Sequence, residues 1–240
     1  MNKTLSVLLA LTALFFADLA FCRAVVTSAS GTVQAQAGTG PSRALRLGDV
    51  VNQGDTISTG GGSSVVLRFD DGQVAALTAN SRMQISAYQY NEPAQSGNVL
   101  LSLLTGGMRA ITGLIGRRNP SQVGYRASTA TIGIRGTDVT LVTLQGNVVV
   151  TVKSGEISFT FNGVTIIIPA GKGVNAKTDQ AFQAQAAEEI LSQLSPEIVE
   201  LIGGLEGLAS AIDAAAGPAP RDRDERRILP AAPPGGGSRS

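Results

Sequence analysis

Histidine is absent from this chain of 240 residues, and cysteine occurs once, at position 22. The absence of histidine removes the usual general base, the Ser-His-Asp arrangement and the commonest metal ligand. A single cysteine allows no internal disulfide and excludes zinc sites built from several cysteine and histidine ligands. Asp, Glu, Lys and Tyr remain available for catalysis, but no paired arrangement of them is visible. We therefore predict no enzyme activity, no cofactor and no metal site.

Aromatic residues are also few, and the chain has almost no net charge. Tryptophan is absent, and aromatic residues make up 4% of the chain. Lys and Arg together number 19, and Asp and Glu number 18. This balance argues against broad electrostatic capture of nucleic acid or anionic membranes. Few rings are available on which bases or sugars could stack. We therefore predict that nucleic acid is not a partner.

The first 24 residues have the pattern of an export signal. Lys3 supplies a positive start, and residues 5–16 form an apolar run that is too short to span a membrane. Small residues permit cleavage after Cys22 or after Ala24. We predict a signal peptide over residues 1–24, an exported periplasmic or cell-surface protein, and no stable membrane span after cleavage.

Cys22 has a second interpretation as the acylated residue of a lipoprotein. The preceding Leu19 and Ala20 fit a lipoprotein box, but Phe21 stands where that box needs a small residue. We therefore predict no lipid anchor at Cys22. The anchored form stays the alternative.

Residues 25–177 show short β-runs broken by Gly, Asp and Asn, which predict one β-domain. Runs at 64–69 and 73–78 flank Asp70-Asp71-Gly72, a hairpin signal. Asn162-Gly163 is the residue pair that a type I′ turn favours, and Ser154-Gly155 also separates two runs. We predict an all-β fold, either a sandwich or roll or a short β-solenoid.

The composition changes near residue 178. Residues 181–194 are rich in good helix formers, and Ser195-Pro196-Glu197 has the residue types that begin a helix. Apolar residues then lie at helical spacing on one face, at Ile198, Leu201, Ile202, Leu205, Leu208 and Ile212. We predict one or two helices over residues 178–216. Residues 217–240 are rich in Pro, Gly and Arg, and we predict them to be disordered.

Several motifs in a fixed order resemble FecR-type domains over roughly residues 31–175. The most specific is residues 131–139, Thr-Ile-Gly-Ile-Arg-Gly-Thr-Asp-Val. The others match in order: Leu47-Gly48-Asp49-Val50 with Gly54-Asp55-Thr56-Ile57-Ser58-Thr59-Gly60, then Ser64-Val65-Val66-Leu67-Arg68-Phe69-Asp70-Asp71-Gly72, Thr105-Gly106-Gly107-Met108-Arg109, Val152-Lys153-Ser154-Gly155-Glu156-Ile157 and Ile168-Pro169-Ala170-Gly171-Lys172-Gly173.

The resemblance implies a domain that binds a protein and does not catalyse a reaction. Family members that regulate iron uptake join a cytoplasmic anti-sigma segment and a membrane span to a periplasmic FecR domain. In this chain the similarity begins close to the predicted cleavage site. We therefore expect a stand-alone binding or scaffold module of the bacterial cell envelope. The alternatives are a sensor that contacts an outer-membrane transporter or a membrane regulator, and a module that binds an envelope polymer or glycan.

Arg135, Gly136, Thr137 and Asp138 are the candidate interaction or structural motif. Arg135 could dock a partner, because a guanidinium binds carboxylates or carbonyl groups in pairs of hydrogen bonds. It could instead tie one β-layer to another while Gly136 adopts a turn conformation that a Cβ atom opposes. Of the two, we expect the structural role.

Three other features have a functional and a structural interpretation. Asp70 and Asp71 could bind calcium, but they lack further acidic ligands, so a turn is expected. The apolar helix face could bind another chain, but packing within this chain is expected. A set of arginines could bind an anion, but we expect them to face solvent: Arg109, Arg117, Arg118, Arg126 and Arg135.

Overall fold

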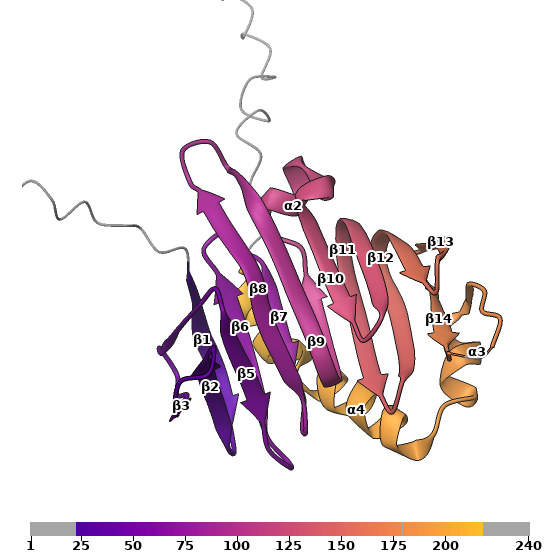
Figure 1. The fold of residues 1–240 in the computed structure, drawn as a ribbon, viewed down its shortest axis with the longest axis horizontal. Helices are drawn as coiled ribbons and strands as arrows, with labels where there is room; N and C mark the ends of the chain where they lie inside the picture. The colour runs from indigo at the N-terminus through magenta and orange to yellow at the C-terminus, as the bar shows by residue number, and fades with distance from the viewer. Residues whose placement is uncertain (1–22, 179, 218–240) are drawn as a thin grey trace, which may run out of the picture.

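A computed structural model describes residues 23–178 and 180–217 of the chain. These residues form a β-structure with short helices on one side (Figure 1). The first eight strands are β1 Arg23–Ser30, β2 Val33–Ala37, β3 Ser42–Ala44, β4 Val50–Asn52, β5 Asp55–Thr59, β6 Ser64–Phe69, β7 Val74–Leu77 and β8 Arg82–Asn91. The remaining strands are β9 Ser96–Ile111, β10 Val123–Ala127, β11 Ala130–Leu144, β12 Asn147–Phe161, β13 Val164–Pro169, β14 Lys172–Ala176 and β15 Gln185–Ala186.

The strands make two layers that share the long strands β9, β11 and β12. One layer contains β4, β1, β6 and β7, then the later half of β9 and of β11, the first half of β12, β14 and β15. The other contains β3, β2, β5 and β8, then the first half of β9, β10, the first half of β11, the later half of β12 and β13. The main apolar core lies between them, with side chains such as Leu67 from the first layer and Ile85 from the second. The prediction of an all-β fold is confirmed, with paired layers as in a sandwich or roll.

The helices cover the outer face of the first layer, which we call the helix-covered layer. They are α3 Ala187–Ser192, α4 Pro196–Gly207 and α5 Ala209–Ala216, and a separate short pair, α2 Leu114–Arg118 and η2 Pro120–Gln122, follows β9. α4 packs on β9 and β11, and α5 packs on β6 and β7. Their apolar residues bury Val142 and Val149 on one side and Val66, Val74 and Ala76 on the other. No helix among residues 23–178 and 180–217 is long and apolar enough to cross a bilayer.

Local signals predicted several elements well. The turn at residues 70–72 joins β6 to β7, and Gly72 has a positive φ of 80°. Asn162 and Gly163 have φ of 50° and 78° between β12 and β13, as a type I′ turn requires. α4 begins at Pro196 with Ser195 in the capping position, although the Ser195 side chain makes no capping hydrogen bond.

Four predictions of local structure were wrong or displaced. Residues 181–194 form a helix only over Ala187–Ser192, because the preceding Phe182 packs against Phe159 and Phe161 at the end of the core. Ser154-Gly155 does not separate two strands but forms an irregularity inside β12. The sequence Arg-Arg-Asn-Pro-Ser at residues 117–121 predicts an exposed basic loop, but its two arginines end α2 and residues 120–122 form η2.

The fourth difference lies at the N-terminal end of the described residues. β1 begins at Arg23, two residues before the predicted start of the β-domain at residue 25. The side chain of Ala24 is 1% exposed, and Ala24 pairs with Val51 and Phe69. Arg23 and Ala24 are therefore part of the first strand. The rest of the predicted signal peptide, including Cys22, lies outside the described residues. The predicted tail also lies outside them, apart from Gly217.

Candidate functional site

The predicted motif lies where β11 passes from one layer to the other. Arg135 pairs with Glu156 in the second layer, which we call the open layer, and Asp138 pairs with Ser154 in the helix-covered layer. Between them the register shifts, so that Gly136 and Thr137 face the single residue Gly155. Gly136 has φ of 58° and Gly155 has φ of 77°. The prediction that Gly136 adopts a conformation favouring glycine is confirmed.

Thr137 fixes this bend through Thr112, a residue that the sequence did not single out. The Thr137 backbone N–H donates to Thr112 Oγ1 at 2.9 Å, and the Thr112 hydroxyl donates to the Thr137 carbonyl at 3.0 Å. The Thr112 backbone N–H donates to the same carbonyl at 2.9 Å. Both threonines are buried. The bend is therefore held by reciprocal bonds between β11 and the end of β9.

Asp138 is bound by Arg109, and not by Arg135. Arg109 Nε and Nη2 donate to the two oxygens of Asp138 at 2.8 Å and 2.6 Å, a bidentate geometry. The side chains of Arg109 and Asp138 are 7% and 13% exposed on the outer face of the helix-covered layer. The hydrogen bond to Asp138 raises the pKa of Arg109. The motif thus contributes its carboxylate to a buried ion pair.

The prediction that Arg135 ties the two layers together was wrong. Its side chain is 75% exposed, and its nearest acidic group, Glu156 Oε1, lies 3.8 Å from Nη1. That distance marks a weak surface contact. Side chains alternate along a strand, and at this position the guanidinium points away from the core. Its role in interaction stays a prediction.

A groove of about 510 Å³ lies beside Arg135 on the open layer. Strands β11, β12 and β13 form its floor, and the short η2 segment forms one wall. Ile167 exposes 53% of its surface there, next to the small residues Gly133 and Ser158. The groove therefore combines an exposed guanidinium, an apolar side chain and polar groups. Its lining residues are Asn119, Pro120, Ser121, Gly133, Ile134, Arg135, Glu156, Ser158 and Ile167.

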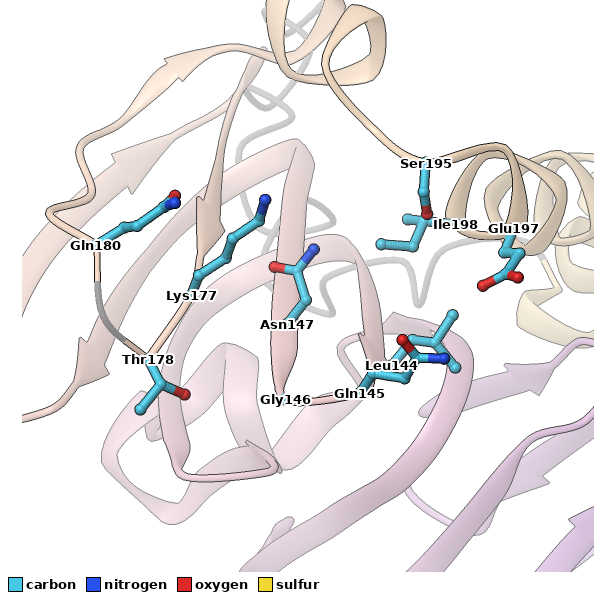
Figure 2. Close-up of a pocket in the computed structure, with 10 residues that line it drawn as sticks. All are labelled: Leu144, Gln145, Gly146, Asn147, Lys177, Thr178, Gln180, Ser195, Glu197 and Ile198. Atoms are coloured by element: carbon cyan, nitrogen blue, oxygen red, sulfur yellow. The ribbon is translucent and has the colours of Figure 1, made fainter.

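Two other hollows lie against α4. Figure 2 shows one of about 430 Å³ between the β11–β12 turn, the residues after β14 and the start of α4. Lys177 and Asn147 project into it, and Asn147 Oδ1 has no hydrogen-bond partner among the residues that the structure describes. A larger one of about 820 Å³ borders Gly203, Gly204 and Gly207. Neither contains a residue of the predicted motif, so the groove at Arg135 is the candidate site.

Of the remaining predicted site residues, Asp70, Asp71 and Arg117 line one small hollow of about 220 Å³. Asp70 accepts a hydrogen bond from the Arg23 backbone N–H at 2.9 Å, and Asp71 accepts one from the Gln73 N–H at 3.1 Å. Within the described ranges, no three acidic or cysteine side chains are grouped so that they could hold a metal ion. Both aspartates therefore shape the turn. The arginines are dispersed: Arg109 is buried, Arg126 is exposed on β10, and Arg117 and Arg118 lie on α2.

Asp71 belongs to a buried polar cluster that sequence reasoning missed. The Tyr88 hydroxyl accepts from the Asp71 N–H at 3.0 Å, and the Tyr125 hydroxyl reaches Gln73 Oε1 at 3.5 Å. Asp71 Oδ2 and Gln73 Nε2 have no hydrogen-bond partner in the described part of the chain. Burial raises the pKa of the Asp71 carboxyl, and hydrogen bonds, chiefly from the Gln73 N–H, offset part of this effect.

The raised pKa of Asp71 predicts a pH dependence of stability. The folded state binds the Asp71 proton more tightly than the unfolded state, whose aspartate pKa is about 3.9. Stability from this group is therefore lost as pH rises from about 3.9 through the higher folded pKa. Asp71→Asn should remove this loss. Urea midpoints of both proteins at a series of pH values from 4 to 8 measure it, and parallel curves for the two proteins would contradict the assignment.

Comparison with known protein families gives a match over the region that contains the motif at residues 135–138. Residues 55–158 match the family model described as FecR protein, a narrower span than the predicted resemblance. No curated protein sequence matches the chain. Two solved structures named "putative anti-sigma factor from Parabacteroides distasonis ATCC 8503" share 15% and 12% identity, each with a TM-score of 0.47.

The first alignment covers 59% of this chain and 64% of that structure, and the second covers 63% and 74%. The chain thus spans less than two thirds of the first structure. These two similarities are too distant to bear on function. The family match includes the bend of β11, the bulge of β12 and the Arg109–Asp138 pair, and residues 55–158 of this chain are a FecR domain.

Proposed function

We propose that this protein is a non-enzymatic, exported module that binds another protein of the bacterial cell envelope through the groove beside Arg135. The observation that carries the proposal is the position of Arg135. It is the basic residue of the predicted motif, it is exposed, and it lies in a hollow with an exposed aliphatic side chain. Arginine is enriched in interfaces, where its planar fork recognises carboxylates and carbonyl groups.

The groove has the properties of a preformed docking site. Its floor is built from β11, β12 and β13, so its side chains are placed by a hydrogen-bonded ladder. Glu156 holds Arg135 only at 3.8 Å, and a carboxylate of a partner could replace it with bidentate geometry. Ile167 offers an apolar contact at the other side. A segment with an acidic and an apolar side chain fits these features.

Arg135→Ala should abolish partner binding and leave stability almost unchanged. Exposed ion pairs contribute about 0–1 kcal/mol, so the melting temperature should stay close to that of the wild type. Loss of a guanidinium at the centre of an interface typically costs about 2 kcal/mol or more in binding, roughly thirtyfold in affinity. A photo-crosslinking residue at Ser158 would capture the envelope partner, and the capture would then be repeated with Arg135→Ala.

Arg126→Ala is the matched control, because Arg126 is exposed on β10 of the same layer and does not line the groove. It should leave both capture and melting unchanged. Equal capture by wild type, Arg135→Ala and Arg126→Ala would contradict the proposal. A large fall in melting temperature for Arg135→Ala alone would restore the structural role.

A further inference from the structure

Strand β13 ends the open layer, and no strand of the described residues covers its other side. Four strands lie at the ends of the two layers: β3, β4, β13 and β15. β3 and β4 have three residues each, and β15 has two. β13 has six residues, Val-Thr-Ile-Ile-Ile-Pro, and within residues 23–178 and 180–217 it pairs only with β12. It is therefore the longest of these four strands, at the end of the layer far from β3 in Figure 1.

The side chains of β13 do not protect this edge. The strand contains no charged residue, and it is rich in β-branched residues, which favour strand pairing. Val164 and Ile167 each expose 53% of their surface. Proteins usually block a long edge strand with lysine, proline, a bulge or a covering segment. Here Pro169 blocks only the last position.

The free backbone groups can be identified from the hairpin. The two-residue turn at Asn162-Gly163 places Phe161 opposite Val164, so these residues exchange both of their hydrogen bonds. Backbone groups alternate along a strand, so Ile166 and Ile168 also bond to β12. The N–H and C=O groups of Thr165 and Ile167 then point away from the sheet. Within the described residues, these groups make no backbone hydrogen bond to any turn, loop or further strand.

We propose that β13 pairs with β13 of a second copy of this chain, antiparallel and about a two-fold axis at Ile166. In this register each Thr165 exchanges hydrogen bonds with Ile167 of the second copy, and Ile166 faces Ile166. The edge is its own complement: the donors and acceptors match, and no charged side chain of the strand is brought against itself. We name a second copy as the partner because two identical uncharged strands meet about this axis without repulsion, and their outward donors and acceptors match. The pairing extends the open layer and does not depend on the function proposed above.

The backbone part of the proposal is tested by Thr165→Pro against Thr165→Val. Both remove the hydroxyl that lies 2.8 Å from Thr160 Oγ1, but only proline removes the outward N–H. Proline is tolerated on an edge strand when its N–H would face solvent, and Pro169 already has this orientation in β13. Sedimentation of the purified full chain should show a dimer for wild type and for Thr165→Val. Thr165→Pro should raise the dissociation constant at least about tenfold, since two symmetric bonds are lost.

The side-chain part uses Ile167→Lys, with Leu104→Lys as control. Leu104 is 50% exposed on β9, and β10, β11 and β12 lie between it and β13 in the same layer. Only Ile167→Lys should give monomers. A third variant, Ile166→Cys with Cys22→Ser, should form a disulfide between two chains under mild oxidation, and Leu104→Cys with Cys22→Ser should not.

A wild-type chain that stays monomeric up to about 100 µM, well above micromolar dissociation constants, would overturn the proposal. So would a dimer that Thr165→Pro and Ile167→Lys leave intact, or crosslinking of Leu104→Cys as fast as of Ile166→Cys. If Thr165→Pro fails to fold, the lysine pair and the crosslink decide the question. All measurements use the purified chain without an envelope partner, so their result is separate from that of the Arg135 experiments.

Discussion

Asp138→Ala should lower the free energy of unfolding by about 3–5 kcal/mol, because it leaves the buried guanidinium of Arg109 without its partner. Both hydrogen bonds of the pair are short, and α4 and α5 cover the face on which the pair lies. Water therefore cannot replace the carboxylate at low cost. The expected loss is a large fraction of the total stability of a typical domain, about 5–15 kcal/mol. Urea unfolding at neutral pH measures it.

Glu156→Ala is the control for Asp138→Ala. It also removes the acidic partner of an arginine, but Arg135 is exposed, so the loss should be about 0–1 kcal/mol. The double variant Arg109→Met with Asp138→Ala should be more stable than Asp138→Ala alone, since it removes the unpaired charge. If Asp138→Ala and Glu156→Ala destabilise the protein equally, the buried pair does not hold the motif in place.

Hairpins with special turn residues could be predicted from the sequence, and long strands could not. Asp70-Asp71-Gly72 and Asn162-Gly163 predict their turns because few other residues adopt the backbone conformations required. Ser154-Gly155 has similar residues, but Gly155 lies at the register shift where β11 and β12 change layers. The turn and the register shift both place a glycine at positive φ. Only the pairing with β11, set by residues distant in sequence, distinguishes them.

Helix propensity failed where tertiary packing was stronger. Residues 181–186 contain good helix formers, yet they form an irregular segment and the short β15. Phe182 packs edge-on against Phe159 and Phe161, so it closes the end of the core. Burial of an aromatic side chain outweighs propensities of a few tenths of a kcal/mol per residue. The start of α4 was predicted because Ser195 and Pro196 favour a helix start locally.

The special backbone conformation of the motif could be predicted, but the roles of its residues could not. The glycine at position 136 and its neighbours indicate a special backbone conformation, as found. Which arginine binds Asp138 depends on the fold: Arg135 is three residues away and Arg109 is 29 residues away. The bulge turns Arg135 outward and Asp138 toward the helices. No local pattern shows that Asp138 faces β9.

The second large effect is expected for Gly155→Ala, with Gly136→Ala as the matched control. Both glycines have positive φ, which costs an alanine about 1–2 kcal/mol. A Cβ atom at Gly136 meets nothing within 4 Å, so that cost is the whole effect expected there.

At Gly155 a Cβ atom lies 2.5 Å from the Gly136 carbonyl oxygen and 2.7 Å from that of Arg135. These are backbone atoms at the bend of β11, and they cannot move without disturbing the strand pair. Overpacking adds about 1–3 kcal/mol, so Gly155→Ala should lose about 2–5 kcal/mol in all. Thermal and urea unfolding of both variants give the comparison. Equal losses would mean that β12 can move away from β11 at this position. The bend would then be held by the Thr112–Thr137 bonds and the Arg109–Asp138 pair alone, and Arg135 would be placed less rigidly in its groove.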